Sequence, residues 1–192
     1  MSKALCVAVF AALLGLAGCA KTLPEQPEVT FAHMPPISLN VRSIESTSVY
    51  QNSETPPNVE ARMQTPPSEV LKRWAGERLR AVGGSGSGRF TVLNAPVTAE
   101  PLPKTTGFVG AFNIEPGTRY TITVEAQLEI LDDGGQRLAV TSARVTQSGN
   151  LDEGVTPEER QAFWYRLTRS AMDGFNAQME RAIYQYLREW MV

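Results

Sequence analysis

The sequence has few residues that could form a disulfide, a metal centre or a nucleophilic active site. Among 192 residues there are two cysteines, Cys6 and Cys19, and one histidine, His33. Cys6 lies in the apolar stretch that opens the chain, so export and cleavage would remove it. One cysteine forms no internal disulfide, and His33 stands alone in a proline-rich segment. These absences exclude Ser-His-Asp and Cys-His catalysis and a histidine-based metal site.

The chain also lacks a strong charge of one sign and a long apolar run. Its formal net charge is −2, which predicts no basic face for nucleic acid. The apolar run Ala4–Leu14 is shorter than the roughly 20 residues that span a bilayer. The remainder of the chain is long enough to form one domain with its own core.

The first eighteen residues have the order of a secretory signal. Lys3 supplies a positive start, Ala4–Leu14 is apolar, and Gly15–Gly18 provides small residues before Cys19. Positive charge, apolar stretch and small-residue exit are the features of an export signal. Everything after this segment is therefore expected outside the cytoplasm.

The exit Leu16-Ala17-Gly18-Cys19 resembles the lipobox of bacterial lipoproteins. The resemblance implies cleavage between Gly18 and Cys19, diacylglycerol on the thiol and usually a further acyl chain on the new amine. Each buried CH₂ contributes on the order of 0.8 kcal/mol, so several chains give a lasting anchor. No other cofactor is expected.

Residue 20 is Ala rather than Asp, which by the same resemblance implies sorting to the outer membrane. The predicted location is thus the periplasmic face of the outer membrane. Lys21 leaves the periplasmic face of the inner membrane as the alternative, because sorting rules differ between bacterial groups.

The sequence divides into a signal (1–18), a lipidated cysteine with a proline-rich tether (19–36) and one domain (37–192). The tether contains Pro24, Pro27, Pro35 and Pro36 and has no helical or strand period. In the domain, periodicity and turn residues predict a strand over 37–50, a helix over 66–82, a strand from Phe90 that bends near 94–96, a long loop over 103–117, a strand over 120–130, a turn at 132–135, a strand over 136–148 and a helix from 157 to the C-terminus.

This order, β-α-β-β-β-α, predicts an α+β two-layer sandwich with both helices on one face of a mostly antiparallel sheet. The strand 120–130 alternates clearly, with Tyr120, Ile122 and Val124 facing the core. Its partner is ambiguous, because either Leu138 and Val140 or the set Ala139, Ala143 and Val145 could face inward.

Two motifs that could suggest chemistry are better explained by structure. Gly83–Gly88 (GGSGSG) follows a helix and ends in Arg89, unlike a phosphate loop, and is interpreted as a flexible connector. The adjacent carboxylates Asp132-Asp133 and Asp152-Glu153 match no calcium-loop spacing and favour solvated turns. No catalytic or metal-binding residue is predicted, and the chain is expected not to be an enzyme.

Exposed aromatic residues are the best candidates for contacts with a partner. Phe108 and Phe112 lie in the long loop, and Tyr184 and Trp190 lie near the chain end, where aromatics occupy more than one side of the helix. Aromatic residues are enriched at protein interfaces. Folding of the loop onto the domain, or packing of the last helix, is the alternative for each pair.

Element order and lipobox together resemble the envelope accessory lipoproteins, namely the lipopolysaccharide-assembly lipoprotein and the auxiliary lipoproteins of ABC-type transporters. The resemblance implies a non-enzymatic, membrane-anchored subunit of an envelope complex, for lipid or lipopolysaccharide transport or assembly. The alternatives are a carrier or sensor of a small amphipathic ligand, an activator of a peptidoglycan-synthesis enzyme, and a hydrolase with carboxylates brought together by folding.

The lipobox gives a direct prediction about Cys19. In cells fed an alkyne-tagged palmitate, Cys19→Ala should lose the label, because the lipid-bearing thiol is gone. Cys6→Ala is the matched control and should keep it, since Cys6 lies inside the signal. Equal labelling of the Cys19→Ala and native chains, read by in-gel fluorescence, would contradict the anchor.

Overall fold

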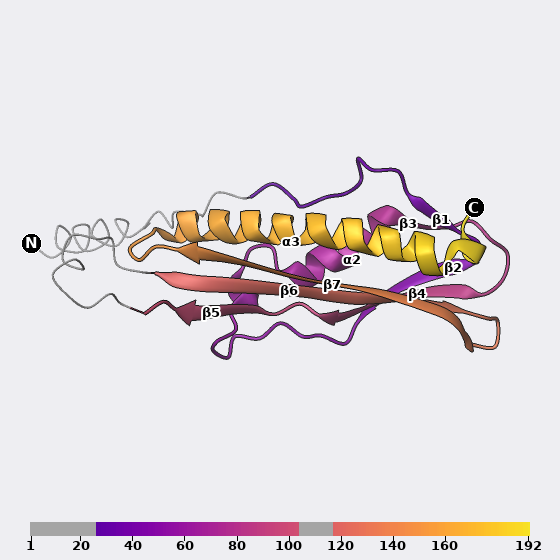
Figure 1. The fold of residues 1–192 in the computed structure, drawn as a ribbon, viewed down its shortest axis with the longest axis horizontal. Coiled ribbons are helices and arrows are strands. Elements are labelled where there is room, and N and C mark those ends of the chain that lie inside the picture. The colour runs from indigo at the N-terminus through magenta and orange to yellow at the C-terminus, as the bar shows by residue number, and fades with distance from the viewer. Residues whose placement is uncertain (1–25, 104–116) are drawn as a thin grey trace, which may run out of the picture.

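The computed structural model describes residues 26–103 and 117–192, which form a two-layer α+β domain (Figure 1). The elements in chain order are β1 (Ile37–Leu39), β2 (Ser43–Ser48), η1 (Glu60–Arg62), α2 (Pro67–Arg78), β3 (Leu79–Ala81), β4 (Ser87–Asn94), β5 (Val97–Pro101), β6 (Thr118–Leu131), β7 (Arg137–Leu151), α3 (Pro157–Tyr186) and η2 (Arg188–Trp190). Helices α2 and α3 pack on the same face of the main sheet, so the predicted fold class is confirmed.

The long hairpin of β6 and β7 is the centre of the main sheet. The two strands pair antiparallel from Thr118↔Leu151 to Leu131↔Arg137. The other side of β6 pairs with β4 and then with β5, two consecutive strands that are separated by a bend in the chain. The bend falls at Ala95-Pro96, as predicted, and the Pro96 carbonyl accepts a hydrogen bond from Thr123 N at 3.1 Å.

Strand β2 lies outside β4 and runs parallel to it, with Ser43 opposite Ser87 and Ser48 opposite Val92. Helix α2 lies in the connection between these two strands, and a crossover of this kind is what a parallel pair requires. The three other strand pairs of this sheet, β4–β6, β5–β6 and β6–β7, are antiparallel. The sheet is therefore mixed but mostly antiparallel.

The single strand predicted over 37–50 is wrong, because the chain breaks after Leu39. β1 pairs with β3 in a separate two-stranded parallel sheet, while β2 joins the main sheet. Between them Asn40 N donates to the carbonyl of Trp190 at 2.7 Å and Val41 N donates to that of Leu39. Hydrogen bonds from the far end of the chain thus override the local alternation.

The predicted first helix ends too late, because Leu79–Ala81 forms β3 instead of a last helical turn. Ile37 lies opposite Leu79 in the β1–β3 pair, and Val82 N donates to the carbonyl of Leu39 at 3.0 Å. Leu79 is buried in β3, and a helix would also have buried it. An apolar residue at this position therefore did not distinguish a strand from a helix. Partners distant in sequence again decide the local structure.

The inward face of the hairpin follows the predicted alternation on β6. Tyr120, Ile122 and Val124 are buried, as are Ala126, Leu128 and Ile130 further along the strand. On β7, Ala143 is buried while Leu138 and Val140 are exposed. The second of the two predicted registers is therefore correct.

Helix α3 covers the inner face of the hairpin along most of its length (Figure 1). Its first turn has the predicted capping box, since Thr156 Oγ1 accepts from Glu159 N and the Glu159 carboxylate accepts from Thr156 N. The helix ends at Tyr186 and a short 3₁₀ turn follows, so the prediction of a helix to the C-terminus is wrong by about one and a half turns. None of the described helices is long and apolar enough to cross a membrane.

An aromatic cluster joins the two layers of the domain. Trp74 of α2 and Phe175 of α3 meet edge to face with ring centroids 5.3 Å apart, and Phe90 of β4 lies 5.6 Å from Trp74. All three side chains are fully buried. Close-packed rings thus fill the space between helices and sheet where a carrier would hold its ligand.

One buried amide ties α2 to α3 beside these rings. The Oδ1 atom of Asn176 accepts hydrogen bonds from Trp74 Nε1 at 2.9 Å and Arg78 Nε at 3.1 Å. Arg78 also forms an ion pair with Glu180 of α3, its Nη2 lying 3.1 Å from Oε2. Buried polar groups need such partners, so this network fixes the crossing of the helices.

The described part of the predicted tether, residues 26–36, packs against α2. Val29 and Phe31 are buried in the core. The Glu77 carboxylate accepts from Phe31 N at 2.6 Å and from Thr30 Oγ1 at 2.8 Å. Part of this proline-rich segment therefore belongs structurally to the domain.

Replacing Asn176 tests the network between the helices. Asn176→Ala should lower the free energy of unfolding by about 2–4 kcal/mol, because two buried donors lose their acceptor. Asp173→Ala, an exposed change on the same helix, should alter it by less than about 0.5 kcal/mol. Urea unfolding measures both, and equal effects would mean that the network contributes nothing.

Candidate partner-binding surface

Strand β7 presents a long backbone edge with no neighbour. One side pairs with β6 over nearly the whole strand, and no other strand within residues 26–103 and 117–192 pairs with it. The opposite margin consists of the shorter strand β2, whose outer side also has no strand partner among the described residues, and of β5, whose outer side bonds to residues 57–59. An unpaired strand edge offers amide and carbonyl groups to another chain.

A groove runs between this edge and the C-terminal half of α3. Its volume is about 500 Å³, and it is lined by Val140, Thr141, Ser142, Gln178, Arg181, Ala182, Gln185 and Tyr186. Further along, α3 closes onto β7, because a Cβ on Gly174 would lie 3.3 Å from Val145. The groove therefore lies to one side of the point where α3 and β7 pack closely, at Gly174 and Val145.

Large exposed apolar side chains lie on β7 and at the end of α3, and two of them, Val140 and Tyr186, line the groove. The described chain has seven large exposed apolar residues, and four belong to β7 or the last turn of α3. These four are Leu138, Val140, Tyr184 and Tyr186, with exposed fractions between 42% and 60%. A group of exposed apolar residues beside an open edge is typical of an interaction surface.

The charges on β7 are of one sign. Arg137 and Arg144 are its only charged residues. Arg137 Nη1 lies 3.2 Å from Glu129 Oε1, and Arg144 Nη1 lies 3.4 Å from Glu125 Oε2, both on neighbouring β6. Both guanidinium side chains remain more than half exposed, so each has donors free on the side away from β6.

The predicted partner contacts are not brought together. Tyr184 is 53% exposed and lines a shallow hollow with Ala177 and Glu180 on the outer side of α3. Trp190 is half-buried near the turn of the hairpin, and its carbonyl is bonded to Asn40. Phe108 and Phe112 lie outside the described residues, as do Gly18 and Cys19.

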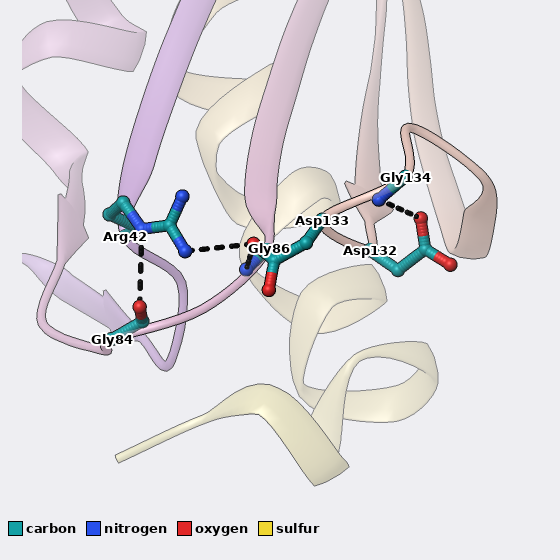
Figure 2. Close-up of polar contacts among 6 residues, drawn as sticks. All are labelled: Arg42, Gly84, Gly86, Asp132, Asp133 and Gly134. Carbon is teal, nitrogen blue, oxygen red and sulfur yellow. Dashed lines mark hydrogen bonds and ion pairs between the residues drawn. The ribbon is translucent and has the colours of Figure 1, made fainter.

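At the hairpin turn, Arg42 links three parts of the chain (Figure 2). Its Nη2 atom lies 2.9 Å from Asp133 Oδ1, and its Nε donates to the carbonyl of Gly84 at 3.1 Å. Gly86 N also donates to Asp133 Oδ1, and Gly86 has φ +64°, which only glycine adopts readily. The glycine-rich connector is therefore held in place by this contact.

The two adjacent aspartates, Asp132 and Asp133, accept hydrogen bonds from backbone amides in turns, and their side chains do not face one another. Asp132 Oδ1 accepts from Gly134 N at 2.9 Å and Gln136 N at 2.8 Å, which fixes the hairpin. Figure 2 shows its side chain turned away from that of Asp133. No group of three or more His, Cys, Asp or Glu residues in the described chain is placed to hold a metal ion.

Glu60 is the one fully buried carboxylate of the described chain, and it lies in η1. It accepts hydrogen bonds from the Tyr50 hydroxyl, from Asn58 Nδ2 and from the backbone amides of Ser53, Val59 and Val97. Burial raises the pKa of Glu60, but the bonds from Asn58, Tyr50 and Ser53 outweigh it and leave this pKa below its usual value. Burial and the Glu60 carboxylate raise the pKa of Tyr50.

These contacts give Glu60 a structural role. Five donors surround its two oxygens and join residues 50–59 to β5, which covers that margin of the sheet. Sequence reasoning missed this residue, because its burial depends on a loop that carries no period. The signal that could have found it is a glutamate directly after apolar Val59, in a stretch of prolines and asparagines.

Comparison with known protein structures gives distant likenesses to lipoproteins. No family model and no curated protein sequence matches the chain. A minor lipoprotein from Acinetobacter baumannii is similar in structure at 16% identity and a TM-score of 0.40, over 77% of this chain and 96% of that one. Rare lipoprotein B from Shewanella oneidensis is similar at 8% identity and a TM-score of 0.37, over 75% and 96%. Both TM-scores are below 0.5, so the function has to be argued from this chain's own residues.

Glu60 predicts how stability depends on pH. Its folded pKa is lower than its unfolded pKa, so its contribution is complete above the unfolded pKa of about 4.3 and is lost as pH falls through the folded pKa. Glu60→Gln should remove this part of the acid destabilisation, while exposed Glu45→Gln should not. Urea unfolding between pH 7 and pH 3 measures both, and identical pH slopes for native and Glu60→Gln chains would contradict the assignment.

Proposed function

We propose that this protein is a non-enzymatic accessory lipoprotein of a cell-envelope complex. Lipid on Cys19 holds it on the periplasmic face of the outer membrane, and the complex works in lipid or lipopolysaccharide transport or assembly. The observation that carries the proposal is the lipobox-like sequence Leu16–Cys19. It lies a short distance along the chain before a domain with a filled core and an exposed groove at its surface.

The packing between the layers favours a docking role over that of a carrier. A carrier needs an apolar space that encloses most of its ligand. Here Trp74, Phe90 and Phe175 occupy the space between helices and sheet with no exposed surface. The larger hollows are open grooves such as that beside β7, where an extended surface of a protein could bind.

The buried and paired carboxylates support the same role. A glycosidase-type mechanism needs two carboxylates that face a common substrate. Glu60 is enclosed by donors, while Asp132 and Asp133 each bind backbone amides of turns. In these positions they shape the domain, which supports a protein that acts by binding.

Crosslinking in living cells tests the proposal. Tagged native chain, Cys19→Ala and Cys6→Ala should be crosslinked, solubilised in detergent and purified, and the captured proteins identified by mass spectrometry. Native and Cys6→Ala chains should recover one envelope transport or assembly protein, and Cys19→Ala should recover much less. An unanchored chain loses its partner, because the anchor keeps both in one thin layer and raises their effective concentration.

Two results would argue against the proposal. Recovery of a reproducible lipid with no protein would favour the carrier. Equal recovery by Cys19→Ala would show that the anchor is not needed for the interaction. Recovery of a peptidoglycan-synthesis enzyme would keep the accessory role and replace transport as its purpose.

A further inference from the structure

We propose that the outer edge of β7, with its groove along α3, binds an extended acidic segment of a partner protein as an added strand. This inference rests on the proposed function, since it names the chemistry by which an accessory subunit would hold its partner. The added strand would continue the main sheet beyond β7.

The backbone of β7 provides the first part of the argument. The strand runs from Arg137 to Leu151 and keeps its pairing with β6 through almost all of that length. Its other edge is open within the described chain, and a regular strand presents its free amides and carbonyls at a fixed repeat. Main-chain bonds to such an edge give affinity with little dependence on the sequence of the added strand.

The groove provides the second part, because it gives alternate side chains a place to go. Side chains of an added strand point in turn to the two faces of the sheet. Those on the helix face would enter the space between Thr141 of β7 and Gln178 and Arg181 of α3. Those on the other face would lie beside Val140 and Arg144, which are exposed.

Charge selects the kind of strand. β7 contains two arginines and no carboxylate, and Arg181 is the one charged residue that lines the groove. Arg181 forms no ion pair among the residues that the structure describes, and Arg137 and Arg144 retain exposed donors. Opposite charges across a strand pair stabilise it, whereas like charges destabilise it. Aspartates or glutamates on either face of the added strand would therefore meet a guanidinium group.

The same charges argue against a second copy of this chain as the occupant. A two-fold pairing of β7 with itself adds two further arginines and brings no carboxylate, whatever its register. Charged residues on an open edge are a known protection against self-pairing. The arginines of β7 thus disfavour self-association and favour an acidic partner.

The test uses model peptides, because the natural segment is not identified. The probe is a fluorescent, acetylated octapeptide of alternating Glu and Val, titrated into full-length lipidated chain in detergent micelles at 150 mM salt. One comparison peptide has Lys in place of Glu. A second keeps Glu and Val but has N-methylated valines, which removes strand hydrogen bonds while charge is retained.

We expect the acidic peptide to bind at least about tenfold more tightly than the lysine peptide or the N-methylated peptide, a difference that anisotropy resolves. Bound peptide should slow amide exchange in Arg137–Leu151 and leave the exchange of β2 unchanged. Arg181→Glu should weaken binding about three- to tenfold, since it replaces attraction by repulsion in the groove. Arg169→Glu, an exposed charge change on α3 away from the groove, should change it less than about twofold.

Three results would overturn the inference. Equal affinity for the acidic and lysine peptides would remove the charge argument. Slowed exchange elsewhere than β7, or undiminished binding of the N-methylated peptide, would remove strand addition. Concentration-dependent dimers with β7 protected in the absence of peptide would make a second copy the occupant. Palmitate labelling tests the anchor, and crosslinking tests the partner. If both of those experiments succeed and the peptide test fails, only the proposed strand addition at β7 is rejected.

Discussion

The structure depends on one burial, that of the apolar stripe of α3 on the inner face of the β6–β7 hairpin. The stripe includes Trp164, Phe175 and Ile183, all buried, and the hairpin offers a matching row along β6. Two strands alone are marginally stable in water, so this hairpin needs the helix across it. The other elements attach to this unit, with α2 joined through Asn176 and the N-terminal segment packed on α2. The described residues contain no cysteine, so this part of the chain gains its rigidity from a long interface between helix and strands.

Much of this architecture could be predicted because its signals are local. The alternation on β6, the Asp-Asp-Gly-Gly turn and the capping box at Thr156 each act over a few residues, and all three are confirmed. The errors fall where distant partners decide the backbone. Leu39 pairs with Ala81, and Leu79 with Ile37, in the small β1–β3 sheet instead of extending a strand and a helix. The carbonyl of Trp190 accepts a hydrogen bond from Asn40 N where one continuous strand was predicted. No periodicity in one segment reports a hydrogen bond from another.

The candidate surface was harder to predict than the fold for a related reason. Tyr184 was identified from its residue type and helical position, and it is exposed. The open edge of β7 has no residue type of its own, because it consists of backbone groups left unpaired by the strand order. Only the register of the strands showed that Leu138 and Val140 lie outside the core. Glu60 was missed in the same way, since its donors come from three separate segments.

With the proposed lipid on Cys19, the packing of residues 28–31 on α2 would limit how far the domain can stand from a membrane. With Cys19 in the lipid, only the seven steps from Cys19 to Gln26 precede the described chain. A fully extended chain of that length reaches about 25 Å. The domain would therefore move as a rigid body on a short tether. It could rotate close to the lipid headgroups but could not cross the periplasm. Under the proposed anchor, any partner would have to come to the membrane surface, so the anchor would set the geometry of the encounter as well as its location.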